Sequence, residues 1–152
     1  MKSSRKFEQQ IHRIVELLET SGGQVTWNDH IPDPDNPTQP RQTDITIRRG
    51  EHLTLIECRL HKLRQNVKWI EELIGRQQSL SADAVIAVSS SGFTKGALNK
   101  AKRYRIIAHD LRNLNESEIR SWGRSVAPRF SSTNTLIWSS FCFSQITPRL
   151  RG

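Results

Sequence analysis

Apolar residues recur at helical spacing in three parts of the chain, and each part predicts a helix. The first runs over residues 5–20, where the apolar positions stand three or four apart and a pair of glycines follows. The second and third are expected over about 66–80 and 94–104. Each opens with a side chain that caps helix N-termini, Asn66 in one case and Thr94 in the other.

Strand patterns occupy the stretches between these helices. Two runs of alternating β-branched or apolar residues flank an Arg-Gly pair at 49–50, which predicts an antiparallel hairpin over 43–59. A short strand is expected over 24–27. The near-continuous apolar run at 83–88 is typical of a strand buried on both faces, and a further strand follows at 105–109. Because a helix separates the last two strands, we expect a right-handed crossover and a parallel pair.

The stretch at 29–40 contains four prolines, which we expect to exclude regular structure and to produce a long loop. Long loops beside a sheet often carry function. The aspartates of this loop are candidate metal ligands, but acids beside prolines are more often turn formers, and we interpret them as such.

The pattern weakens toward the end of the chain, over residues 124–152. A short helix is expected over about 115–122, and an alternating run at 135–143 suggests one more strand, which has no obvious partner. We therefore divide the chain into a domain at 5–112 and a C-terminal extension of helix and strand at 113–152. The extension adds to a sheet edge or belongs to an incomplete second module.

Composition narrows the class of protein. At 152 residues the chain is long enough for one domain with a real core. A net charge of +8 favours a polyanionic partner, most simply nucleic acid, because each neutralised phosphate releases counterions. Two cysteines, Cys58 and Cys142, are too few for a disulfide framework, and the five histidines lack the paired spacing of a zinc site. No apolar run is long enough to span a bilayer and no signal peptide is apparent, so we expect a cytoplasmic protein without a membrane partner.

The predicted hairpin brings charged side chains together. If its loop is formed by residues 49–50, Asp44 lies opposite Leu55. Asp44 is then diagonal to Glu57, roughly 7–8 Å away at the backbone, and two carboxylates at that distance are able to share one hard cation. Arg59 joins them because side chains alternate sides along a strand. A four-residue loop keeps this pairing, whereas a three-residue loop moves Asp44 to the other face.

The same spacing also suits an ordinary surface. On a half-exposed antiparallel pair these side chains are solvated, and Glu57 with Arg59 is a surface ion pair. Glu8 in the first helix is either a solvated acid favoured by the helix dipole or an acid that leans over the sheet toward the cation. Gln78, near the end of the second helix, is either a surface residue or a group that orients a water or a phosphate.

Several motifs follow one another in a recognisable order. An acid lies on the second strand and a Glu-x-basic motif on the third, and a helix, a buried strand and a helix come next. The motifs are Phe7-Glu8, Arg41-Gln42-Thr43-Asp44-Ile45, Leu55-Ile56-Glu57-Cys58-Arg59 and Val88-Ser89-Ser90-Ser91-Gly92-Phe93-Thr94, followed by Gly96-Ala97 and Ala101. Over roughly residues 5–112 the chain resembles the PD-(D/E)xK nuclease superfamily, and within it the Mrr-type restriction-endonuclease-like domains.

This resemblance implies an α/β fold with a three-layer α/β/α core and a mixed central sheet. It implies a metal-dependent deoxyribonuclease in which Asp44 and Glu57 hold Mg²⁺, with Mn²⁺ as a substitute, and in which Glu8 completes the metal shell. The lysine of the family motif falls at Arg59 in this sequence. The expected partner is DNA, and pairing of two copies as a homodimer is left open.

Arg59 is the departure from the family pattern, and it separates two functions. A lysine is able to lose its proton to assist a water, whereas a guanidinium stays protonated. It still binds phosphate through two hydrogen bonds. We therefore predict a Mg²⁺-dependent DNA endonuclease in which Arg59 clamps the phosphate and Gln78 or the substrate phosphate helps to activate the water. The alternatives are a catalytically inactive nucleic-acid-binding module with the nuclease fold, and an interaction domain whose charge is incidental.

Contacts to DNA phosphates are expected from basic side chains beside the acidic motif, on the loop after the hairpin and on the third helix. The candidates are Arg41, Lys62, Arg64, Lys95 and Lys100.

Overall fold

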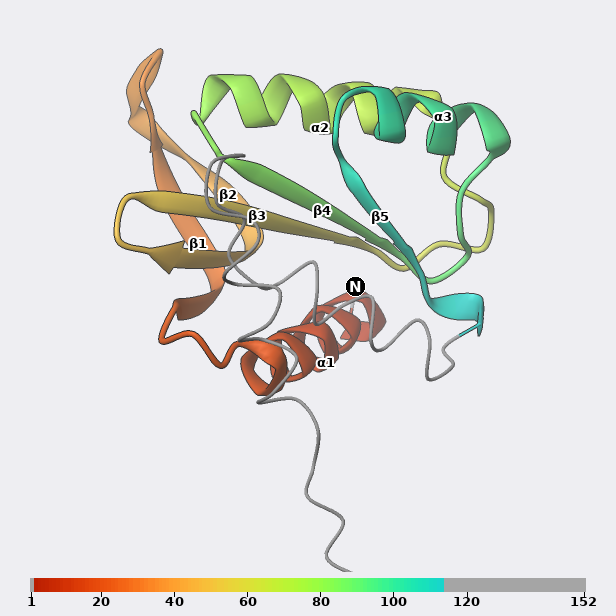
Figure 1. The fold of residues 1–152 in the computed structure, drawn as a ribbon, viewed down its shortest axis with the longest axis horizontal. Coiled ribbons are helices and arrows are strands. Elements are labelled where there is room, and N and C mark those ends of the chain that lie inside the picture. The colour runs from red at the N-terminus through yellow and green to blue at the C-terminus, as the bar shows by residue number, and fades with distance from the viewer. Residues whose placement is uncertain (1, 114–152) are drawn as a thin grey trace, which may run out of the picture.

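A computed structural model describes residues 2–113, which form a five-stranded sheet with helices on both faces (Figure 1). The predicted helices and buried strands are present, with boundaries that differ by a few residues. In chain order the elements are α1 (Lys2–Leu18), β1 (Gln24–Asp33), β2 (Asn36–Arg49), β3 (His52–Arg59), α2 (Val67–Ser79), β4 (Ala84–Ser89), α3 (Lys95–Arg103), β5 (Ile107–Asp110) and the 3-10 helix η1 (Leu111–Asn113).

The sheet is mixed, and its strands lie in chain order from β1 to β5. Neighbouring strands are antiparallel from β1 to β3 and parallel from β3 to β5. Helix α1 lies against one face of the sheet, while α2 and α3 lie across the other (Figure 1). The predicted three-layer α/β/α core is confirmed, and so is the parallel pair of β4 and β5.

Each face of the sheet has its own apolar core. The core under α1 contains Phe7, Ile11, Val15, Ile45, Ile47, Ile56, Cys58, Ile86 and Val88. The core under α2 and α3 includes Leu55, Trp69, Ile70, Leu73, Val85, Ala87 and Phe93. Successive residues of β3 and β4 thus point into opposite cores, which explains why these strands are continuous apolar runs in the sequence.

Both predicted helix caps are present. The side chain of Asn66 accepts a hydrogen bond from the backbone N–H of Lys68 at 3.1 Å, and α2 begins at the next residue. The hydroxyl of Thr94 accepts one from the N–H of Ala97 at 3.2 Å at the start of α3. Each cap satisfies one backbone donor that the first turn of a helix leaves without a partner.

The expectation of an irregular loop at 29–40 is wrong. Strand β1 continues to Asp33 and β2 begins at Asn36, so the two strands form a long hairpin that projects beyond the rest of the sheet (Figure 1). In the described part of the chain, residues 36 and 41–43 of β2 pair with β1, and none of residues 36–44 pairs with β3. Prolines are tolerated there because one side of each strand has no ladder to support, and the register shifts around Pro32.

The turn between β2 and β3 lies one residue later than predicted. It is formed by residues 50–51 and not by 49–50. Gly50 adopts a φ of +58°, a left-handed conformation that glycine takes at no steric cost and that two-residue hairpin loops require.

This turn changes the pairing of the acidic residues. The last pair of the β2–β3 ladder joins Ile45 to Ile56, so Asp44 comes opposite Glu57 and not opposite Leu55 as predicted. The change in pairing is two residues, which preserves the alternation of side chains. The two acids therefore remain on one face, just beyond the last pair of the ladder.

The helix predicted at 115–122, the strand predicted at 135–143 and Cys142 lie outside the described residues. The division of the chain at residue 112 stays a prediction. Within residues 2–113, no helix is long and apolar enough to cross a membrane.

The core under α2 gives a first prediction, for the free energy of unfolding. Ile70 is fully buried, so Ile70→Ala leaves a cavity and is expected to lower the free energy of unfolding by about 2–5 kcal/mol. Leu17 on α1 is 81% exposed, and Leu17→Ala is expected to change the stability by less than about 0.5 kcal/mol. Urea titration followed by circular dichroism measures both; equal effects would contradict the assigned core.

Candidate active site

Two acids on neighbouring strands form the centre of the candidate site. Glu57 alternates with Leu55 along β3, and it therefore faces α2, with an exposed fraction of only 9%. Asp44 is flanked by Ile45, which points to the α1 side, so its own side chain also faces α2. The carboxylate of Asp44 accepts a hydrogen bond from the backbone N–H of Cys58 at 2.8 Å, which ties it to β3 beside Glu57.

The acids lie where the sheet opens. Beyond Ile45, β2 leaves β3 and continues with β1 alone, so a cleft forms between the end of this ladder and the flank of α2. The cleft has a volume of about 550 Å³. Its lining residues are Arg41, Glu57, Cys58, Arg59, Trp69, Glu72, Leu73, Gly75, Arg76 and Ser79.

Both carboxyl groups are perturbed in the direction that favours protonation. Burial, and then the negative charge of Asp44, raise the pKa of Glu57 from 4.5 to about 7, against the opposing effects of Arg76 and Arg59. Burial, and to a smaller extent the charge of Glu8, raise the pKa of Asp44, while the hydrogen bond from Cys58 lowers it. A bound cation would therefore stabilise the ionised form of this pair of carboxyl groups.

Arg76 supplies such a cation, and sequence reasoning missed it. Its Nη1 lies 2.6 Å from Oε1 of Glu57 and donates a second hydrogen bond to the backbone carbonyl of Gln42 at 3.0 Å. The available signal was helical spacing, because Arg76 stands four residues after Glu72 and seven after Trp69, on the flank of α2 that lines the cleft.

Arg59 also lines the cleft, but it is paired with a different acid. Its Nη2 lies 2.9 Å from Oε2 of Glu72, and its Nη1 donates to the side-chain oxygen of Gln65 at 3.4 Å. The guanidinium lies over the ring of Trp69, 4.7 Å from the ring centroid. Three contacts thus hold Arg59 at the wall opposite β2, with its charge still close enough to lower the pKa of Glu57.

The other two predicted catalytic residues differ in position. Glu8 is half-buried on α1, accepts a hydrogen bond from Ser4 at 3.1 Å, and influences the pKa of Asp44. Gln78 is exposed and is not one of the described residues that line the cleft. Two positions along a helix rotate a side chain by more than half a turn, so Gln78 and Arg76 cannot both face the cleft.

Of the five predicted phosphate-binding residues, Arg41 lines the cleft and the other four do not. The Nε of Arg41 lies 2.7 Å from Oδ2 of Asp33. The other oxygen of that carboxylate, Oδ1, accepts a hydrogen bond from the N–H of Asp35 in the manner of a turn former. Lys62 and Arg64 are exposed on the loop after β3. Lys95 is exposed at the start of α3, and Lys100 pairs with Glu71 at 2.6 Å.

The donor set fits a small divalent cation bound by few protein ligands. Within the described residues there is no group of three or more His, Cys, Asp or Glu side chains arranged to hold a metal. Mg²⁺ commonly takes one or two carboxylates and completes its octahedron with waters and substrate phosphates, and Asp44 and Glu57 provide two such oxygen ligands.

Two solved structures share this fold. The crystal structure of AF1548, a protein of unknown function, matches with a TM-score of 0.60 and 17% identity, covering 76% of this chain and 64% of that one. VC1899 from Vibrio cholerae matches with a TM-score of 0.63 and 14% identity, covering 82% of this chain and 35% of that one. The chain thus spans less than two thirds of either protein. No curated protein matches the chain.

The mixed sheet, its flanking helices and the acids at its opening define a restriction-endonuclease-like domain. The Mrr_cat family model, described as a restriction endonuclease, matches residues 3–117. The chain belongs to this family, as its sequence motifs predicted, and it is a nuclease-type domain.

The raised pKa of Glu57 makes stability depend on pH. Its carboxyl group has a higher pKa in the folded state than in the unfolded state, so folded protein binds more protons between about pH 4.5 and 7 and loses stability as pH rises through that window. The shift corresponds to about 3 kcal/mol at most. In EDTA, Glu57→Gln is expected to match the wild type at pH 5 and to be more stable at pH 8.

Urea titrations of the wild type and the variant at several pH values measure this difference. A constant gap between the two proteins from pH 5 to pH 8 would contradict the raised pKa, because a purely steric effect of the amide does not titrate.

Proposed function

We propose that the domain is a metal-dependent DNA endonuclease whose reaction centre is the cleft between β2, β3 and α2. The observation that carries the proposal is the half-buried carboxylate of Asp44, hydrogen-bonded to β3 beside the buried carboxylate of Glu57, which lines a cleft together with Arg41, Arg59 and Arg76. Burying two like charges is unfavourable unless a cation joins them, so their presence together indicates a site for one.

Asp44 and Glu57 would hold Mg²⁺, or Mn²⁺ in its place, and Glu8 would complete the metal shell, since its charge already acts on Asp44 and raises the pKa of that carboxyl group. When bound, the metal polarises a phosphate and lowers the pKa of a coordinated water. The hydrogen bond from Cys58 orients the carboxylate of Asp44, and burial under α2 restricts the rotamers of Glu57. The chain's own contribution is therefore a rigid pair of oxygen ligands.

Arg59 is suited to bind the phosphate and to stabilise negative charge on it, because its planar guanidinium offers several donors in fixed geometry. It cannot act as a base. Its stacking on Trp69 leaves the charge at the cleft, and a substrate phosphate would replace Glu72 as its partner.

DNA would approach across the rim of the cleft. Exposed cations on the β3–α2 loop and at the start of α3 would contact its phosphates, together with Arg41 on the projecting hairpin, which lines the cleft. Such contacts supply affinity and position without reading sequence. The phosphate-binding residues we propose are Arg41, Lys62, Arg64, Lys95 and Lys100.

A second candidate is a nucleic-acid-binding domain that does not cleave. One observation favours it: both guanidinium groups nearest the acids are already paired with carboxylates, Arg76 with Glu57 and Arg59 with Glu72. In this case Arg76 is a permanent counter-charge of Glu57, and the cleft binds phosphate alone.

Cleavage assays separate the two candidates. With Mg²⁺ or Mn²⁺ the protein is expected to nick supercoiled plasmid, and both Asp44→Ala and Glu57→Ala are expected to reduce nicking to background because the metal loses half of its protein ligands. Glu51→Ala, at the exposed turn between β2 and β3, is the matched control and should cleave normally. DNA binding without cleavage by wild type with either metal would support the second candidate instead.

Arg76 provides a prediction about metal affinity itself. Because its guanidinium competes with the metal for Glu57, Arg76→Ala is expected to lower the Kd for Mn²⁺ about five- to tenfold, equivalent to about 1–1.4 kcal/mol. Isothermal titration measures this without any turnover.

Arg76→Lys keeps the charge and is expected to change the Kd less than Arg76→Ala does. Lys68→Ala removes an exposed cation from the same helix and should leave it unchanged. Weaker Mn²⁺ binding by Arg76→Ala would mean that Arg76 supports the carboxylate pair and does not compete for it.

A further inference from the structure

The loop between β3 and α2 presents an apolar side chain to solvent. Residues 60–64 are all exposed, and Leu63 at 72% is one of the most exposed large apolar residues in the described part of the chain. Exposed leucines are common on protein surfaces, and exposure alone carries no conclusion. The feature that distinguishes Leu63 is the network that holds its backbone.

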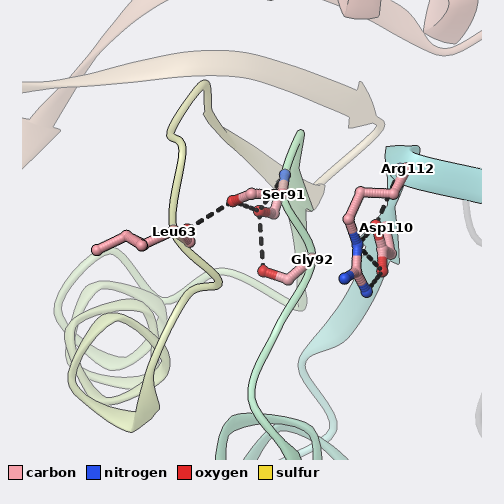
Figure 2. A network of polar contacts seen from close by, with 6 residues as sticks. Leu63, Ser91, Gly92, Asp110 and Arg112 are labelled. Atoms are coloured by element: carbon pink, nitrogen blue, oxygen red, sulfur yellow. Dashed lines mark hydrogen bonds and ion pairs between the residues drawn. The ribbon is translucent and has the colours of Figure 1, made fainter.

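Hydrogen bonds fix this loop to the turn that follows β4. The carbonyl of Leu63 accepts from Ser91 Oγ at 2.6 Å and from Gln65 Nε2 at 3.1 Å. Two residues earlier, the N–H of His61 donates to Ser90 Oγ at 3.0 Å, and that hydroxyl lies 3.3 Å from the carbonyl of His61. Figure 2 shows the Leu63 side chain extending away from Ser91, so the backbone is held inward and the isobutyl group is directed outward.

Further contacts stabilise the turn after β4 itself. Ser89 Oγ donates to the carbonyl of Gly92 at 3.1 Å, and that carbonyl also accepts the N–H of Gln65 at 2.8 Å. Gly92 has a φ of +78°, and a methyl group there would collide with the ion-paired side chains of Asp110 and Arg112, which lie beside it in Figure 2. The loop is thus built on a framework that joins the ends of β4 and β5.

The charge around Leu63 indicates the kind of partner. Lys62 and Arg64 flank it directly, His61 precedes them, and no acidic residue occurs from Cys58 to Ile70. Protein–protein interfaces are depleted of lysine at their centres. Leu63 is more exposed than Leu60, the other leucine of this loop, at 72% against 41%. A prominent apolar side chain among cations instead matches the wedges with which proteins separate stacked bases while contacting the flanking phosphates.

We propose that Leu63 is a wedge that enters between two adjacent base pairs of bound DNA, unstacks that step and bends the duplex toward the cleft. The inference rests on the proposed binding of DNA at this site. Leu63 lies four residues after Arg59 in the chain, so the wedge and the cleft occupy the same end of β3. Steps that unstack easily, such as TA, would then be favoured in contact with the loop.

Binding and unstacking are measured separately in EDTA, which prevents cleavage. A short duplex with 2-aminopurine at a central TA step reports unstacking by a rise in fluorescence, and the anisotropy of a dye on the same duplex reports binding. Saturating wild-type protein is expected to raise the 2-aminopurine signal about threefold or more, because the probe loses its stacking quench. Leu63→Ala is expected to abolish the rise while changing the Kd by less than about threefold, since the phosphate contacts remain.

Leu63→Met keeps a long apolar side chain and should retain the rise, and Leu17→Ala, an exposed leucine on α1, is the matched control with unchanged signal. Binding without a fluorescence rise in wild type, or an equal rise with Leu63→Ala, overturns the wedge and leaves the DNA-binding proposal standing. Absence of any anisotropy change overturns both. If the wild type is a dimer, Leu63→Ala is a monomer and the fluorescence rise is the same for both, Leu63 belongs to an interface between copies. That result also overturns the wedge.

Discussion

The half-buried carboxylate of Asp44 and the buried carboxylate of Glu57 repel each other, and the contacts around them offset that repulsion. Asp44 and Glu57 come together because β2 and β3 pair up to Ile45 and Ile56 and no further. The hydrogen bond from Cys58 holds one acid, while Arg76 from α2 neutralises the other. The packing of α2 on the sheet therefore does more than bury apolar surface, since it also carries the counter-charge of the site.

All three arginines that line the cleft are paired with acids in the same way. Arg41 is held by Asp33, Arg59 by Glu72 and Arg76 by Glu57. Of these pairs, Arg59–Glu72 is exposed on both sides and contributes little to stability, so exchanging Glu72 for another anion has a low free-energy cost. In these pairs each arginine charge that lines the cleft is balanced by a neighbouring carboxylate.

The Ser-Gly-Phe-Thr turn after β4 has a structural part in this arrangement. The hydroxyls of Ser90 and Ser91 fix the β3–α2 loop, and Thr94 caps α3 from the same segment. A turn with three consecutive serines is thereby explained without nucleophilic chemistry. Its hydrogen bonds set the position of the loop that follows Arg59.

Local patterns in the sequence were sufficient for the helices, the buried strands, both caps and the shared face of Asp44, Glu57 and Arg59. That face was predictable because alternation along a strand depends only on parity, and the actual turn changed the pairing by an even number of residues. Local patterns could not predict the exact partner of Asp44 or the strand character of the proline-rich hairpin. Both depend on which edges of β2 are paired.

Only the tertiary structure decided what the charged side chains contact. Arg76 is nineteen residues from Glu57, and Ser91 is twenty-eight from Leu63, so neither pair leaves a periodic trace in the chain. Gln78 and Arg76 are equally polar in sequence, and the rotation of α2 on the sheet determines that Arg76 lines the cleft. Periodicity records which face of an element is buried, whereas contacts between side chains on different elements depend on how those elements dock.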